Sequence, residues 1–419
     1  MLERFLNNKY LKNVTVMFSG AIISQIMTVL ISPLLTRIYT PGELGQFTIF
    51  LTICTLILPI LNARYDLLIV SVKDRIEANT LVTLSFIISL VILSLVSITI
   101  IIINIFTYDI FGINIIYLYF LIPFILIGSM NNILKSYMNR LEHYHLMSKV
   151  LVMRSSTQAV MQIAFGALSF NVIGLIIAYV VSYFSGFIIQ IKMFLRHYKI
   201  SSVKLFETFV NYKNQILFST PSIFINGLSY SIIIFLISNL YSPYEVGMYS
   251  ITVRVLGLPL TFISLSFSRV FFEKAARDYN SKGEFKNLLQ KTTLVLLVIS
   301  IPVFILLTFI SPSLFPLIFG EQWVDAGIYV SFLAPMYAIR LIVSTVSLSI
   351  IIISKQKVEL LLQTCFVVSC VVVYFITNAF DFDITLFLSL ISFTFSLNYI
   401  VFYIYLYKNS VSKNHPQND

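Results

Sequence analysis

The sequence predicts an all-α protein that crosses a membrane about twelve times and consists of two six-helix lobes. Three observations lead to this fold class. Hydrophobic residues make up 58% of the chain and charged residues only 11%, whereas about a quarter of the residues in a soluble domain are charged. The basic residues fall almost entirely in alternate links between apolar runs. One link motif also occurs twice at a fixed offset.

Each apolar run is close to the ~20 residues that a membrane-spanning helix needs. The links between the runs are too short to form a domain outside the membrane. We predict spans at residues 14–37, 45–72, 79–106, 115–137, 151–169, 172–191, 214–240, 247–271, 292–311, 326–353, 359–377 and 384–407.

The basic residues predict the orientation. When the links are counted alternately from the N-terminus, 23 of the 28 lysines and arginines lie on the N-terminal side, and the opposite links hold only Arg37. Because basic links stay in the cytoplasm, both termini are expected there. The net charge of +10 is then explained by rims that face anionic membrane lipids, and we expect no nucleic-acid partner.

The repeated motif predicts the lobes. Residues 38–49, IYTPGELGQFTI, and residues 240–251, LYSPYEVGMYSI, share five identities at an offset of 202. Six predicted spans separate the copies, so both face the same side and the repeat is parallel, as in transporters with two like-oriented halves. Thr or Ser before Pro predicts a tight turn, and Glu is placed to cap or charge the new helix. The identical pairs are Tyr39 and Tyr241, Pro41 and Pro243, Glu43 and Glu245, Gly45 and Gly247, and Ile49 and Ile251.

We therefore divide the chain into a lobe at 1–191, a basic cytoplasmic linker at 192–213, a second lobe at 214–407 and a cytoplasmic tail at 408–419. Substrate sites in transporters of this plan lie between the halves.

Charges inside the spans are the candidate functional residues, because an arginine at mid-helix costs about 2.5–3.5 kcal/mol and generally faces water or a partner. Arg64 and Asp66 lie in the run LNARYDLLIV. On a continuous helix they would point about 200° apart, so Asp66 is expected to orient a cation on another helix while Arg64 faces the lumen. The other arginines within or at the edge of predicted spans are Arg254, Arg269 and Arg340.

Structural roles for these arginines stay open. Arg269 lies close enough to the span end to extend its side chain to the lipid headgroups.

Catalysis is poorly supported, since no outward link holds paired carboxylates or a GxSxG motif, and the longest one, near 311–325, has no Arg, Lys or His. We predict no enzyme, no metal site and no cofactor.

The run at residues 11–50, followed by ARYDLLIV, resembles the start of polysaccharide-biosynthesis membrane proteins. These are the Wzx-type flippases of O-antigen and capsule repeat units, in the multidrug/oligosaccharidyl-lipid/polysaccharide exporter superfamily. The match covers about the first 75 residues, and the second link copy and the topology extend it along the chain. The resemblance implies two lobes around a central cavity with alternating access. It also implies an undecaprenyl-diphosphate-linked oligosaccharide as substrate, and a bacterial plasma (inner) membrane as location.

The charges fit this expectation, because arginine binds phosphate oxygens through bidentate hydrogen bonds. We expect Arg64, Arg254, Arg269 and Arg340 to form a cationic patch for the diphosphate. Coupling to H+ or Na+ stays open, with Asp66 as the coupling or orienting group, and so do contacts with a polysaccharide polymerase and a chain-length regulator. The alternatives are a drug or cation antiporter of the same superfamily, which needs membrane carboxylates, and a polytopic glycan polymerase.

Overall fold

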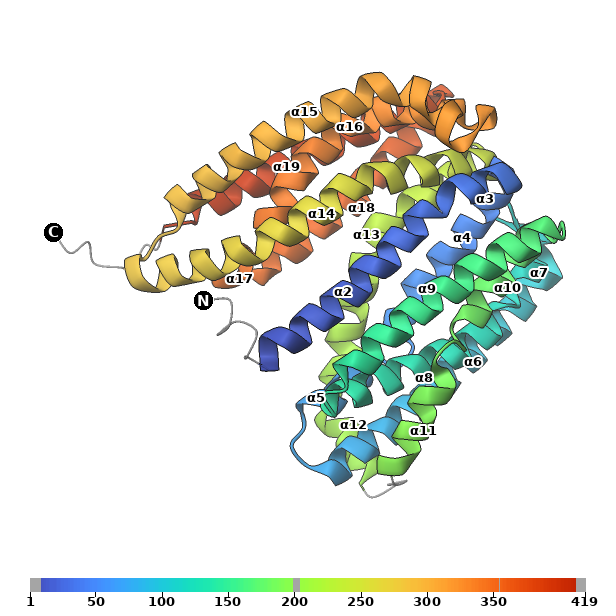
Figure 1. Cartoon of the computed structure of the whole chain (residues 1–419), viewed down its shortest axis with the longest axis vertical. Helices are drawn as coiled ribbons and strands as arrows, with labels where there is room; N and C mark the ends of the chain where they lie inside the picture. The colour runs from blue at the N-terminus through green and yellow to red at the C-terminus, as the bar shows by residue number, and fades with distance from the viewer. Residues whose placement is uncertain (1–8, 199–203, 354, 412–419) are drawn as a thin grey trace. The chain divides into compact units, whose positions relative to one another are not determined.

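The computed structural model describes residues 9–198, 204–353 and 355–411, and these are folded almost entirely into helices (Figure 1). The chain forms two compact units, residues 1–231 and 232–419, and the boundary in sequence falls within helix α13 (Thr220–Leu240). The lobe boundaries expected from the sequence stay a prediction.

Long helices form the first unit. Its one sheet in the described residues is a short antiparallel hairpin of β1 (Asp109–Ile110) and β2 (Ile113–Asn114). The helices are α2 (Lys9–Leu30), α3 (Ser32–Ile38), α4 (Pro41–Ile57), α5 (Tyr65–Ser71), α6 (Arg75–Phe106), α7 (Ile115–Leu118), α8 (Leu121–Arg140), α9 (Tyr144–Ala167), α10 (Asn171–Ser182), α11 (Phe187–His197) and α12 (Leu205–Asn211).

Helix α13 (Thr220–Leu240) follows a π-helical turn at Gln215–Ser219 and leads into the second unit. The helices of that unit are α14 (Pro243–Lys282), α15 (Lys286–Phe319), α16 (Val324–Val346), α17 (Ser349–Ile352), α18 (Gln356–Phe380) and α19 (Ile384–Lys408).

Each predicted span has a helical counterpart. Ten helices among the described residues are long and apolar enough to cross a membrane, and the bent pair Gln215–Ser229 and Ser231–Leu240, which meet at 51°, would make an eleventh. The one remaining predicted span, 151–169, corresponds to α9, which carries Lys149, Arg154 and two glutamines and is therefore less apolar. The predicted pattern of about twelve long apolar helices is thus confirmed.

The second predicted span is not the continuous helix that the sequence suggested. Helix α4 ends at Ile57 and a short 3-10 turn covers Leu58–Ile60. The backbone then passes through the left-handed region at Ala63 and Arg64, with φ of 45° and 67°. The expected 200° separation of Arg64 and Asp66 was therefore wrong, because the helix α5 starts only at Tyr65. Pro59, which lacks an amide donor, marks this break in the sequence.

The repeated motif builds the same turn in both units. Thr40 caps α4 by accepting from the amide of Glu43, whose carboxylate accepts from the Thr40 amide. Ser242 caps α14 in the same way from the amide of Glu245. The Glu245 carboxylate instead accepts a hydrogen bond from the Tyr329 hydroxyl of α16. One copy is thus a complete capping box, and the other joins two helices.

The paired tyrosines also act alike. The hydroxyl of Tyr39 donates to the Gln162 carbonyl of α9 at 2.7 Å, and that of Tyr241 donates to the Phe382 carbonyl just beyond α18 at 2.9 Å. Burial and the Glu43 carboxylate raise the pKa of Tyr39 to about 12, so its phenol stays a donor. In each unit the repeat therefore fastens the residues before a long helix, α4 or α14, to a neighbouring segment, α9 or the residues just after α18.

Candidate substrate-binding site

The break between α4 and α5 brings three charged side chains of the first unit together. The Asp66 side chain is 8% exposed, and the cations that act on its carboxylate are Arg64 and Lys135 of α8. The Arg64 side chain is half-buried, and its Nε has no hydrogen-bond partner among the described residues. Asp66 is thus a buried carboxylate with one cation nearby on its own segment and one on another helix.

A hydrogen-bond network supports this break. The Asn132 amide donates to the Leu58 carbonyl at 2.8 Å and to Asn62 Oδ1 at 3.3 Å. Asn62 in turn donates to the Ser85 carbonyl of α6 at 3.3 Å. Carbonyls that a broken helix leaves without intrahelical donors need such partners. The asparagines therefore hold the broken span in a fixed shape.

Next to the break lies a cavity of about 120 Å³ with several polar side chains in its wall, the polar cavity of this unit. Two cations, Lys135 and Arg154, line it, and no carboxylate does. The buried Gln190 also lines it, and its Oε1 has no partner in the described part of the chain. The remaining lining residues are Met17, Leu58, Asn131, Asn132, Met147, Val150, Leu151 and Tyr183.

Arg154 is the residue that sequence reasoning missed, because it was counted with the cytoplasmic link before its span. The structure places it well inside α9, with its guanidinium 3.4 Å from the ring centroid of Tyr183 and 5.9 Å from that of Tyr179. Tyr179 lies on α10 and Tyr183 directly follows the helix, one turn later. Their hydroxyls are 3.1 Å apart. Cation–π contacts hold an arginine in apolar surroundings without neutralising its charge. The spacing of Tyr179 and Tyr183 was the available sequence signal.

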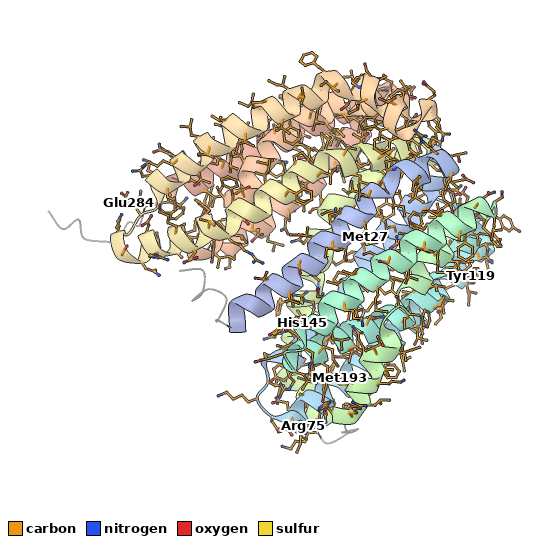
Figure 2. The ribbon with its side chains drawn as sticks, in the orientation of Figure 1. Met27, Arg75, Tyr119, His145, Met193 and Glu284 are labelled. Atoms are coloured by element: carbon orange, nitrogen blue, oxygen red, sulfur yellow. The ribbon has the colours of Figure 1, made fainter. Side chains whose placement is uncertain are left out.

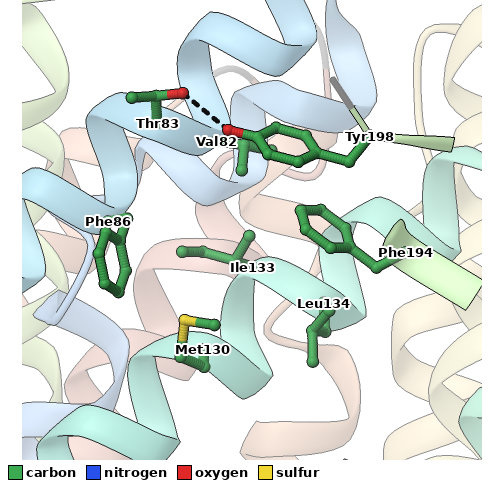
Figure 3. Close-up of a pocket in the computed structure, with 8 residues that line it drawn as sticks. All are labelled: Val82, Thr83, Phe86, Met130, Ile133, Leu134, Phe194 and Tyr198. Carbon is green, nitrogen blue, oxygen red and sulfur yellow. Dashed lines mark hydrogen bonds between the residues drawn. The ribbon is translucent and has the colours of Figure 1, made fainter. Parts of the chain in front are cut away.

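A second cavity in the first unit is apolar. It has a volume of about 280 Å³ and lies between α6, α8 and α11 (Figure 3). Its polar groups, the hydroxyls of Thr83 and Tyr198, bond to each other at 2.9 Å. The other lining residues are Val82, Phe86, Met130, Ile133, Leu134 and Phe194.

Helix α8 separates the two cavities. Met130, Ile133 and Leu134 line the apolar cavity, whereas Asn131, Asn132 and Lys135 line the polar one. Helix α11 contributes Phe194 to the apolar cavity and Gln190, one turn earlier on the helix, to the polar one. The first unit therefore offers cationic and hydrocarbon surroundings a single helix apart.

The predicted arginines of the second unit differ in exposure and in position along their helices. Arg254 is half-buried on α14, Arg269 is exposed on the same helix, and Arg340 of α16 is half-buried, with its guanidinium 5.3 Å from the Tyr337 ring centroid. Arg254 and Arg269 are fifteen residues apart on α14, which corresponds to ~22 Å along a helix. One diphosphate is too small to contact both.

Comparison with known proteins gives a family and a fold. A family model described as polysaccharide biosynthesis protein matches residues 34–328. No curated protein sequence matches the chain significantly.

Three solved structures share the fold. The lipid II flippase MurJ, in an inward closed conformation, is 15% identical, with a TM-score of 0.74 over 94% of this chain and 86% of that one. An inward-facing multidrug resistance MATE family transporter of the MOP superfamily is 16% identical, with a TM-score of 0.71 over 91% and 93%. An outward-facing MATE family transporter is 16% identical, with a TM-score of 0.58 over 97% and 96%. The predicted fold class is confirmed, and these three proteins are described as transporters or a flippase.

Proposed function

The chain belongs to the polysaccharide biosynthesis protein family, and from this premise we propose that it is a flippase for lipid-linked oligosaccharides. The substrate class is an undecaprenyl-diphosphate-linked repeat unit of O-antigen or capsular polysaccharide. The protein would carry it from the cytoplasmic to the outer leaflet of a bacterial plasma (inner) membrane, with both termini in the cytoplasm. A polysaccharide polymerase and a chain-length regulator would act on the product.

The observation that carries the proposal is the arrangement around α8. A lipid-linked diphosphate has an anionic head and a hydrocarbon tail, and α8 has a cationic cavity on one face and an apolar cavity on the other. Arginine replaces the hydration of a phosphate by bidentate hydrogen bonds, and lysine by a point charge. We assign Arg64, Lys135 and Arg154 to the head in this unit.

The arginines of the second unit would act in succession. Arg254 and Arg269 are too far apart along α14 to hold one diphosphate together, so the arginines of this unit, with Arg340 on α16, would receive it in succession as access alternates. Each contact compensates part of the cost of moving a charged head through a region of low dielectric.

Asp66 fits an orienting role better than a coupling role. Its carboxylate is buried, with Arg64 on the same segment and Lys135 on α8 in its neighbourhood, and we assign it to orienting these cations. Its burial also disfavours the cation antiporter, which needs a carboxylate open to its ion. We propose that export is coupled to H+ and assign this coupling to no single residue.

Complementation tests the proposal. A strain that lacks its lipid-linked glycan exporter would receive wild type, Arg64→Gln, Arg154→Gln or Arg340→Gln at matched membrane levels. We expect wild type to restore surface glycan, and the variants to leave undecaprenyl-diphosphate-linked units in the cytoplasmic leaflet. Arg277→Gln, at an exposed ion pair with Glu273, is the matched control and should behave as wild type. Equal export by all the glutamine variants, with loss only on charge reversal, would refute the cationic patch.

A further inference from the structure

A groove between α14 and α15 combines hydrocarbon and positive charge in one cavity. Its volume is about 250 Å³. Phe267, Val270 and Phe271 line it from α14, together with Lys274, and Leu288 and Val295 line it from α15, together with Lys291 and Thr292. Neither predicted site residues nor the proposed transport function uses it.

The two lysines lie at the same level of the helical hairpin. The tip of the hairpin is Gly283, with φ of 72°, and Figure 2 labels Glu284 beside it. Lys274 comes nine residues before the tip and Lys291 eight residues after it. Both side chains are exposed, and neither ammonium has an ion pair or hydrogen bond with another described residue. The neighbouring Arg277 and Lys282, in contrast, pair with Glu273 and Asp278.

The hairpin is anchored at its tip, so the groove has a fixed floor. The Phe285 amide donates to the Ser410 carbonyl at 3.0 Å, beyond the end of α19. The Phe285 ring is buried and meets the rings of Phe271 and Tyr279 edge to face. Phe271, which lines the groove, is therefore held in place by its contact with the buried Phe285 ring.

Helix length places the lysines at the headgroups. Lys274 lies 31 residues after Pro243, where α14 starts, which corresponds to ~46 Å along the axis. Lys291 lies 28 residues before Phe319, where α15 ends, which corresponds to ~42 Å. A bilayer with its headgroups is about 40–45 Å thick. Both ammonium groups thus reach the headgroup layer on the side with the basic links. Phe267 and Val295, each 24 residues from the far end of its helix and so ~36 Å along the axis, lie where the hydrocarbon begins.

We propose that this groove binds an anionic phospholipid of that leaflet, with its phosphate between Lys274 and Lys291 and one acyl chain against Phe267, Val270 and Val295. Thr292 supplies a hydroxyl donor at the same level. Zwitterionic lipid carries a choline cation beside its phosphate, which two lysines repel. The site does not depend on which glycan the protein transports.

Native mass spectrometry of the purified full-length protein tests the site. Detergent-solubilised protein is titrated with phosphatidylglycerol and phosphatidylcholine of the same acyl chains. Two lysines at about 1 kcal/mol each predict roughly 30-fold tighter binding of the first phosphatidylglycerol. Equal retention of the two lipids by wild type would overturn the proposal, and this comparison needs no variant.

Variants locate the site. Lys274→Gln with Lys291→Gln should bring phosphatidylglycerol down to the level of phosphatidylcholine, and Lys274→Arg with Lys291→Arg should keep the preference. Arg277→Gln with Lys282→Gln removes the same charge from the same hairpin outside the groove and should change the preference less than twofold. Loss of preference in that control pair as well would mean a diffuse charge effect and would contradict the site.

A competitor identifies the occupant. Undecaprenyl diphosphate is added at the same concentration as phosphatidylglycerol. It should displace no more than half of the phosphatidylglycerol bound in the groove. Its preferential retention, abolished by the same lysine pair, would make the groove a substrate site and overturn the phospholipid assignment.

Discussion

The guanidinium of Arg140 holds the link between α5 and α6 in place. It lies at the end of α8 and donates to the carbonyls of Ile69 at 2.9 Å, Lys73 at 3.0 Å and Val72. These carbonyls lie in the last turn of α5 and just after it, where intrahelical donors run out. Arg140 was counted in the sequence only as one of the basic residues that set the orientation. Its structural role could not be predicted, because it depends on where a distant helix ends.

Arg140→Ala should destabilise the protein. Hydrogen bonds from a charged group are worth about 1.5–3 kcal/mol, and their loss leaves several carbonyls without donors. We expect a clearly lower melting temperature of the purified protein, followed by loss of the monodisperse peak on heating. Arg277→Ala, at an ion pair exposed by more than 70% on both sides, should change the unfolding free energy by less than ~0.5 kcal/mol. Equal melting of the two variants would contradict the role of Arg140.

Arg64 and Arg154 show how far sequence reasoning reached for the site. Arg64 was identified because an arginine inside an apolar run is costly, and the structure places it at a break beside Asp66. The orientation of the pair was wrong, since the calculation assumed a regular helix. Arg154 was missed because hydropathy cannot show that two tyrosines on α10 will cover a cation on α9.

The repeated turns at the starts of α4 and α14 were the best-predicted elements. Thr40 and Ser242 cap their helices as the motif suggests, and Pro41 and Pro243 occupy the first turns, where no amide donor is needed. What the motif could not show is that Glu245 bonds to Tyr329 rather than to its own helix end. That difference arises from the neighbouring helix α16, which the motif does not contain.

The cap at α4 gives a measurable prediction. Thr40→Ala removes the side-chain acceptor of the Glu43 amide, and loss of such a cap costs about 1 kcal/mol. Thr40→Ser keeps the oxygen and should be close to neutral. Thermal unfolding of the purified variants measures both, and a Ser variant as unstable as the Ala variant would argue against the cap.

Close packing of α15 on α16 depends on one glycine. A Cβ at Gly327 would lie 2.6 Å from the Ser311 carbonyl oxygen, whereas a Cβ at Gly257 in α14 would meet nothing within 4 Å. Gly327→Ala should therefore destabilise the protein by about 1–3 kcal/mol. Gly257→Ala should be neutral or stabilise α14 by up to ~1 kcal/mol. Opposite shifts in the melting temperature are expected, and a stabilised Gly327→Ala protein would show that the helices can separate at no cost.

Across the whole chain, charge and hydropathy predicted the fold class because the membrane enforces them. Backbone groups in hydrocarbon must be satisfied within helices, so apolar runs and basic links were enough to indicate the pattern of spans. The weakest span in composition, α9, is the one that carries Arg154 and lines the polar cavity. Its low hydropathy is thus a consequence of the site, whereas this span was predicted from the sequence with no significance attached to its composition.

The most direct test of the proposed function is translocation by the purified protein in liposomes. The substrate is an oligosaccharide linked to a polyprenyl diphosphate and loaded into the inner leaflet, and its arrival outside is followed by cleavage with an added glycosidase. We predict faster arrival than in protein-free liposomes, slowed at least tenfold by Arg154→Gln and unchanged by Arg277→Gln. Arrival no faster than in protein-free liposomes, with uptake of a cationic drug instead, would contradict the flippase and support the antiporter.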